Sequence, residues 1–204
     1  MNLSRLLTFL HDINKLKSEF RHAWIFLDRK ESVADHCWRV SFMVILLAPY
    51  LKIPINIEKA LKMSIIHDLA EAKTGDTHLF EFLNNSILSE EKGKKEKKAM
   101  QKILSILPIT LRKELNDLWI EFEEESTNEA KFVLAIDKLE AHIQHNEADF
   151  STWTEEEINS VYSGYLDKYC DFNDYLNELK KLVLIESSEK IQTESNRKQS
   201  ELKS

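Results

Sequence analysis

The shortage of residues that interrupt helices is the strongest constraint on how this chain can fold. Only three Gly and three Pro occur in 204 residues. A β-rich protein of this length needs many tight turns, and turns draw heavily on these two residue types. The apolar fraction of 43% is large enough for a hydrophobic core, so the chain is not disordered as a whole. We therefore expect an all-α fold, in one ordinary domain.

Capping residues and helical spacing of apolar side chains divide the chain into segments. Ser32 and Asp35 resemble a capping box that opens a helix to about Leu47. Asn56 is a candidate cap for a helix that should end near Lys73, before Gly75. The other helices are expected at residues 2–20, 90–107, 108–122, from the Ser-Thr-Asn-Glu pattern at 126–129, from the Thr-Glu-Glu-Glu pattern at 154–157, and at 172–184.

Composition changes sharply near the C-terminus. From Glu186 onward the chain is mostly Ser, Glu, Lys, Gln and Asn, with almost nothing apolar. Such a segment cannot bury enough surface to offset the entropy of ordering it. We expect a folded domain over residues 1–185 and a polar, disordered tail over residues 186–204.

Net charge, cysteine usage and hydropathy limit the environment and the partners. The formal charge of −7 disfavours binding to a nucleic-acid polymer. Cys37 and Cys170 form no metal-binding or redox spacing, which fits a reducing compartment. No apolar run reaches membrane-spanning length, and the N-terminus lacks the pattern of a signal peptide. We expect a cytoplasmic protein without membrane association.

Two histidines and two aspartates stand out as candidate metal ligands. They are His36, the adjacent pair His67 and Asp68, and Asp137, which follows the apolar run at residues 132–136. A carboxylate in an apolar segment is costly to bury unless a cation or hydrogen bonds compensate its charge. Imidazole nitrogens and carboxylate oxygens are common ligands of divalent transition metals. The pattern indicates one such ion held between helices, in a metal-dependent hydrolase.

Glu71 and Asp76 are candidates for proton transfer beside that ion. Residues three or four apart share one face of a helix, so Glu71 should face the same cavity as His67 and Asp68. Asp76 follows Gly75, where the chain can turn back toward the cavity. Both residues also have ordinary explanations, Glu71 as a solvated helix carboxylate and Asp76 as a turn residue.

The candidate ligands and the stretches around them resemble those of a known family. His36, His67–Asp68 and Asp137 are similar to the four-residue signature of the HD-domain metal-dependent phosphohydrolases. Longer stretches resemble its 5′-deoxynucleotidase group: ESVADH at 31–36, HDLAEA at 67–72, GD at 75–76, LRKEL at 111–115, LW at 118–119, EAKFV at 129–133 and DKLE at 137–140. The likeness spans about residues 6–182.

The resemblance implies an HD-domain helical bundle and a specific reaction. Enzymes of this group remove the 5′-phosphate from deoxyribonucleoside monophosphates with a single divalent transition ion. His36, His67, Asp68 and Asp137 would be its ligands, and Glu71 and Asp76 the acidic catalytic pair. Arg21 matches a phosphate-binding arginine. Trp24 is the candidate for a tryptophan that blocks the ribose 2′-hydroxyl, although here His22 and Ala23 separate it from Arg21, which leaves the deoxyribose preference open.

Several alternatives remain at this level. The chain has no histidine between His78 and Asp137, which disfavours the two-metal branches of the superfamily; His78 itself is a candidate cavity residue. Another phosphorylated metabolite as substrate, or a non-catalytic nucleotide-binding module, would use the same residues. We interpret the four remaining histidines as structural: His11, His22, His142 and His145. The metal could be Mn, Co, Fe, Ni or Zn, and the resemblance implies a homodimer.

Overall fold

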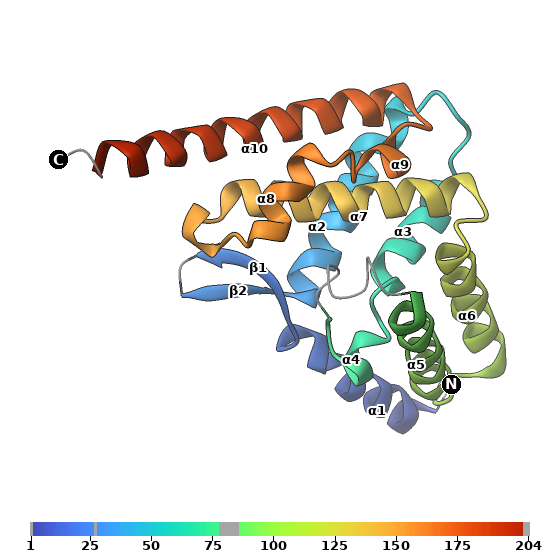
Figure 1. Cartoon of the computed structure of the whole chain (residues 1–204). Helices are drawn as coiled ribbons and strands as arrows, with labels where there is room; N and C mark the ends of the chain where they lie inside the picture. Colours follow the sequence, from blue (N-terminus) through green and yellow to red (C-terminus); the bar gives the residue numbers. More distant parts are fainter. Residues whose placement is uncertain (1, 27, 78–85, 202–204) are drawn as a thin grey trace.

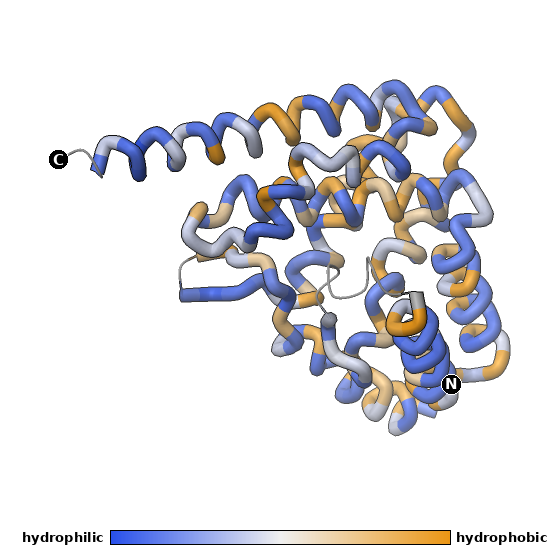
Figure 2. The backbone as a smooth tube through the Cα atoms, in the orientation of Figure 1, coloured by the Kyte–Doolittle hydropathy of each residue, from blue (hydrophilic) through white to orange (hydrophobic). Residues whose placement is uncertain are grey.

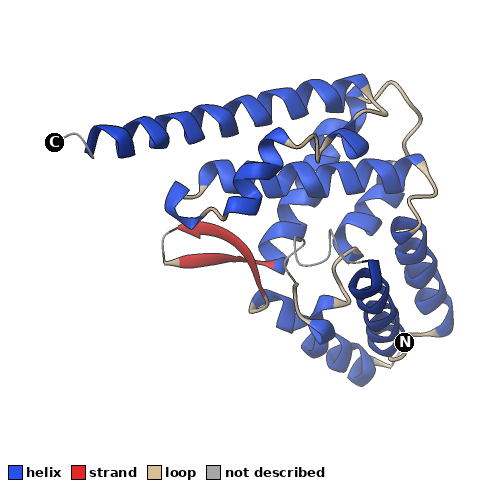
Figure 3. Cartoon of the chain, in the orientation of Figure 1, coloured by secondary structure: helices blue, strands red, loops and turns tan. Residues whose placement is uncertain are grey.

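Helices form nearly all the regular structure in the residues that the computed structural model describes, which are 2–26, 28–77 and 86–201 (Figures 1 and 3). The expected all-α class is confirmed. No described helix is both long enough and apolar enough to cross a membrane. The helices are α1 (Leu3–Ile13), α2 (Val33–Leu47), α3 (Ile57–Ile66), α4 (Glu71–Thr74), α5 (Ser86–Leu104), α6 (Ile109–Glu123), α7 (Asn128–Glu147), α8 (Glu155–Tyr162), α9 (Asp167–Cys170) and α10 (Asp174–Glu201).

One β-hairpin was not expected from the sequence. The first helix ends at Ile13 and a short 3-10 turn follows, so the chain enters strand β1 (Phe20–Phe26) and returns in β2 (Arg29–Ser32). The strands are antiparallel, with Phe20 opposite Ser32. Aromatic residues favour a pleated, half-buried surface, and β1 packs against α7, where Gln144 Nε2 donates to the Trp24 carbonyl at 2.7 Å. The hairpin therefore depends on a contact with a distant helix.

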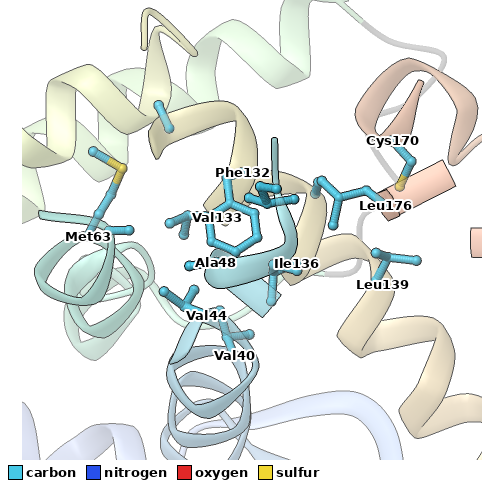
Figure 4. Packing of buried hydrophobic residues seen from close by; sticks show 14 of the residues in the cluster. Val40, Val44, Ala48, Met63, Phe132, Val133, Ile136, Leu139, Cys170 and Leu176 are labelled. Atoms are coloured by element: carbon cyan, nitrogen blue, oxygen red, sulfur yellow. The ribbon is translucent and has the colours of Figure 1, made fainter. Parts of the chain in front are cut away.

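Helix α7 is the centre of the larger hydrophobic core. It carries both apolar and polar buried side chains and is covered by α2, α3 and α10 (Figures 1 and 2). Its apolar side chains pack into the core, and its buried polar side chains include Asp137 and Glu140. The buried side chains around it come from five helices (Figure 4): Val40, Val44, Met63, Phe132, Val133, Ile136, Leu139, Cys170 and Leu176.

A second core fills the space between α4, α5 and α6. Its buried members include Ile66, Met100, Ile103 and Trp119. Residue His67 connects the two cores, because its ring packs edge-on against Phe122 with the ring centroids 5.4 Å apart. The segment that carries the His-Asp pair is therefore held on both sides by close packing.

The helix expected to run from Asn56 to Lys73 is interrupted. Helix α3 ends at Ile66, residues 67–70 form turns, and α4 resumes at Glu71. The amides of Leu69 and Glu71 bond to the carbonyls three residues before them, both at 3.0 Å, as in a 3-10 turn. The prediction that His67 and Glu71 share one regular helix face was wrong. Both residues nevertheless reach the same cavity.

The C-terminal helix is longer than the sequence indicates. Its predicted end was near Leu184, yet α10 continues to Glu201. Lys190 Nζ donates to the carbonyls of Asn146 and Ala148, where α7 ends, and Ser187 Oγ donates to Asn146 Oδ1 at 2.6 Å. These hydrogen bonds satisfy backbone carbonyls at the C-terminal end of α7 and stabilise α10 beyond its predicted end. The division of the chain at residue 185 remains a prediction.

The expected helix caps are confirmed with one shift. Ser32 and Thr154 each form a complete capping box with the acidic residue three positions later, and Asn56 caps α3. Helix α7 is capped by Thr127 rather than Ser126. Glu129 instead accepts a hydrogen bond at 2.8 Å from the backbone amide of Asn56, so this glutamate joins the starts of α3 and α7.

Candidate metal centre and adjoining cavity

The four predicted ligands converge on one point between α2, α7 and the turn after α3. His36 Nε2 lies 3.0 Å from Asp137 Oδ1 and 3.8 Å from Asp68 Oδ2. His67 Nε2 lies 3.2 Å from Asp68 Oδ2 and 4.0 Å from Asp137 Oδ1. The two Nε2 atoms are 3.4 Å apart. Side chains separated by up to 101 positions in the chain thus form one cluster.

Hydrogen bonds at the far side of each ring orient the two imidazoles. His67 Nδ1 donates to the Ser64 carbonyl at 2.8 Å, and His36 Nδ1 donates to Glu140 Oε2. Such bonds fix the neutral tautomer in which Nε2 carries a lone pair. Two lone pairs then face each other beside the carboxylates of Asp68 and Asp137. This arrangement needs positive charge between the four atoms, from a proton or a cation, and the donor set fits a divalent metal ion.

The shifted pKa values of the clustered side chains also show that this site favours a positive charge. Burial and Arg21 lower the pKa of His36, but Glu140 and Asp137 outweigh them and raise it to about 10. The pKa of Asp137 is held well below its ordinary value, because Lys138, His36 and His67 outweigh the effect of burial. Lys138 Nζ is 2.7 Å from Asp137 Oδ2. The site therefore stabilises anionic carboxylates and a positive charge next to them.

Arg21 is held beside this cluster from strand β1. Its Nε forms an ion pair with buried Glu31 Oε2 at 3.2 Å, and its Nη1 donates to Asp68 Oδ2 at 3.4 Å. Glu31 stands at the end of β2, directly before the capping box of α2. The hairpin that the sequence did not reveal is thus what brings the arginine to the metal centre.

Glu71 and Asp76 also face the cavity. Glu71 is 5% exposed, and its Oε2 has no hydrogen-bond partner among the described residues. Burial, with the charges of Asp68 and Asp76, raises the pKa of Glu71 to about 10. Burial also raises the pKa of Asp76, whose amide donates to Glu19 Oε1 at 3.2 Å. Gly75 between them has φ +78°, a conformation that favours glycine.

A cavity of about 150 Å³ opens from this cluster. Asp68, Asp137, Glu71, Asp76 and Arg21 line it together with side chains of α7 and α8. Trp24 is not among the described residues that line it. The Trp24 ring instead stacks under Lys30 Nζ, 5.4 Å from the ring centroid. The structure therefore brings together all the predicted site residues except Trp24; His78 lies outside the described residues.

Sequence reasoning missed the residues that support the metal centre and those that form the rest of the cavity. Glu140 binds His36 and forms an ion pair with Arg39 Nε at 3.1 Å. It lies three residues after Asp137, and that spacing places both on one helix face. The missed cavity residues are His22, His142 and His145, interpreted as structural, together with Glu157, Ser160 and Tyr165. His145 lies two turns after Asp137 on α7, a signal that the sequence did contain.

Comparisons with known proteins agree with this geometry. A family profile described as HD domain matches residues 13–169. The human 5′-deoxynucleotidase HDDC2 is 36% identical over 144 residues, which are 70% of this chain and 67% of the human protein. The 5′-deoxynucleotidase hdd1 of Schizosaccharomyces pombe is 31% identical over 189 residues, 88% of this chain and 92% of its own. The crystal structure of a predicted metal-dependent phosphohydrolase from Magnetospirillum magnetotacticum MS-1 aligns with a TM-score of 0.74 and 27% identity, covering 92% and 96% of the two chains.

Proposed function

Because the chain belongs to the HD-domain family, we propose that it is a metal-dependent phosphohydrolase that removes the 5′-phosphate from deoxynucleoside or nucleoside 5′-monophosphates. The relatives named 5′-deoxynucleotidase support this reaction. The observation that carries the proposal is the convergence of His36, His67, Asp68 and Asp137 on one point beside a cavity that also contains Arg21.

These four residues would hold one divalent transition ion, which could be Mn, Co, Fe, Ni or Zn. Such an ion supplies Lewis acidity toward the phosphate oxygens and makes water a better nucleophile at neutral pH. The protein itself provides the orientation of the ligands. Glu140 fixes the ring of His36 and the Ser64 carbonyl fixes that of His67. Misplacement of either ring would weaken the site.

Arg21 is suited to position the phosphate group. A guanidinium presents several donors in a plane and matches the geometry of phosphate oxygens. Glu31 and Asp68 each engage one of its nitrogens, which restrains the side chain before substrate arrives. The cost of ordering it on binding is therefore small.

Glu71 and Asp76 would manage the protons. In hydrolysis, water attacks phosphorus, the bond from phosphorus to O5′ breaks, and O5′ must gain a proton. The raised pKa of Glu71 and of Asp76 means that this pair can hold a proton near neutral pH. One carboxyl would deliver the proton to O5′ while the other receives one from the attacking water.

The position of Trp24 is compatible with a second class of substrate. The side chain of Trp24 does not line the cavity, so Trp24 makes no contact there that would restrict the sugar. A phosphomonoesterase for another small metabolite would fit this cavity, and a panel of phosphomonoesters separates the two substrate classes. A non-catalytic nucleotide-binding module is disfavoured, because all six imidazole and carboxylate positions are present.

The expected assembly and location belong to the same proposal. We propose a cytoplasmic homodimer that binds neither membranes nor nucleic-acid polymers. Leu3, Leu7 and Leu10 are exposed on one face of α1, and Trp38 and Phe42 are exposed and stacked on α2. Apolar side chains that gather on a helix face mark an interaction surface. Both cysteines are free thiols, as in a reducing compartment.

Replacement of His67 or Asp68 by alanine tests the proposal. We expect phosphate release from deoxynucleoside monophosphates, assayed with added Mn²⁺ or Co²⁺, to fall on the order of a thousandfold. Matched controls are His11→Ala and Asp117→Ala, at exposed positions on α1 and α6. Undiminished turnover in both H67A and D68A would end the proposal.

A further inference from the structure

A second polar cluster lies in the cavity, away from the metal centre. It consists of His22 from β1, His142 and His145 from α7, and Glu157 and Ser160 from α8. His145 is eight residues beyond Asp137, which is about 12 Å along a helix axis. Ala141 lies between them on the same face, and its small side chain leaves room in the cavity. Nothing in the proposed phosphate chemistry uses this cluster.

Glu157 organises one half of the cluster. Its carboxylate is 3% exposed. Oε1 lies 2.9 Å from His22 Nδ1 and 3.3 Å from His145 Nε2, so both imidazoles can donate to it. Oε2 accepts the amide of Thr154 at 2.7 Å in the capping box of α8. The start of α8 is therefore tied to the side chains that line the cavity, and this wall is rigid.

His142 provides a hydrogen-bond acceptor in the same wall. Its Nδ1 donates to the Lys138 carbonyl at 3.0 Å, which leaves the lone pair on Nε2. Ser160 Oγ lies 3.4 Å from this Nε2 but only 2.7 Å from the Glu157 carbonyl, which takes its single proton. Burial lowers the pKa of His142, so the ring stays neutral. Nε2 of His142 and Oγ of Ser160 thus have acceptor capacity for a ligand.

We propose that this cluster binds the nucleoside part of the substrate, with His142 Nε2 and Ser160 Oγ accepting hydrogen bonds from its N–H or O–H groups. This inference rests on the proposed function, because the metal centre then takes the phosphate. An acceptor-rich wall at one end of the cavity and a cluster that could hold a cation at the other match the two chemical halves of a nucleoside monophosphate. His142 and Ser160 would therefore determine which phosphomonoesters are good substrates.

Substitution of His142 tests the inference with three substrates. In His142→Phe, which keeps a ring for stacking on Tyr165, we expect kcat/KM for deoxyadenosine monophosphate to fall about tenfold, the value of one hydrogen bond. His142→Gln, whose amide oxygen can replace Nε2, should recover most of that loss. Hydrolysis of 4-nitrophenyl phosphate, which lacks such donors, should be unchanged. If His142→Phe also lowers kcat/KM for 2-deoxyribose 5-phosphate about tenfold, the contact is to the sugar. If kcat/KM for this substrate is unchanged, the contact is to the base.

A binding measurement separates this inference from the proposed function. Titration of deoxyadenosine into the metal-free protein, followed by saturation-transfer NMR, requires no hydrolysis. We expect contact signals with wild type and His142→Gln, and weaker signals with His142→Phe and Ser160→Ala. His11→Phe on the exposed face of α1 is the matched control. If wild type hydrolyses no nucleotide, the proposed function fails and nucleoside binding still decides the inference. Equal loss for 4-nitrophenyl phosphate, or no nucleoside binding by wild type, would overturn it.

Discussion

The pKa values of the imidazoles at the candidate metal centre and of those near α8 are shifted in opposite directions. Both pairs are largely buried beside the same cavity, and both contact carboxylates. At the metal centre the pKa of His36 is raised to about 10, and the pKa of His67 is also raised. Near α8, burial lowers the pKa of His142 and lowers that of His145 to about 4. The same side chain, shielded from solvent in both places, therefore has two different chemistries.

The balance of buried carboxylates explains the difference. Three carboxylates surround the two imidazoles of the metal centre, namely those of Asp68, Asp137 and Glu140. Near α8 one carboxylate, Glu157, bonds to His22 and His145, while His142 bonds to a carbonyl. Where carboxylates are in excess, positive charge is favoured, and a proton or a metal ion can supply it. Where they are scarce, desolvation dominates and imidazole remains a neutral hydrogen-bonding group.

The largest expected contrast is between the titrations of His36 and His145 in the metal-free protein. NMR of the imidazole C–H groups should show the pKa of His36 at about 10 and the pKa of His145 at about 4. Zn²⁺ should abolish the titration of His36, because the metal takes its lone pair, and leave that of His145 unchanged. Titration of both rings near their ordinary value would refute the comparison.

The second contrast concerns Glu140, whose carboxylate bonds to Nδ1 of His36. Glu140→Gln removes a buried negative charge that both orients His36 and increases its basicity. Metal affinity, measured by competition with a chelator, should fall about 10- to 100-fold. Glu147→Gln is the matched control, since Glu147 lies on the same helix and pairs with the same Arg39 but is exposed. Equal affinity in the two variants would remove Glu140 from the metal site.

The smallest expected effect is on stability at mildly acidic pH. The pKa of His145 is lowered in the folded protein, so the unfolded chain binds more protons between pH 6.5 and about 4. Stability therefore falls as pH decreases through that window. His145→Gln removes this contribution, so wild type should lose about 2 kcal/mol more stability than the variant between about pH 7 and pH 5. Urea denaturation measures the difference.

The exposed His11 supplies the control for that measurement. It lies on α1, away from the cavity. His11→Gln should keep the pH dependence of wild type, because this exposed side chain lies outside the buried cluster around His145. If His11→Gln and His145→Gln behaved identically, His145 would not be a buried neutral imidazole.

The amino-acid sequence by itself predicted the helical class, most helix caps and the four side chains that meet at the candidate metal centre. Helical periodicity and the bonds of Ser32, Asn56 and Thr154 involve residues a few positions apart, so they can be read locally. His36, His67, Asp68 and Asp137 were recognisable because polar groups in apolar segments require compensation. Such polar groups can be recognised without knowing which helices pack together.

Only the tertiary structure decided how the site is completed. The hairpin that carries Arg21 depends on α7, the pairing of Glu140 with His36 joins residues 104 positions apart, and α10 extends because Lys190 meets the end of α7. Trp24 lies outside the cavity, whereas His142 and His145 lie inside it. Local patterns contain no information about such pairs, because the free energy of each contact depends on burial that exists only once distant helices have packed.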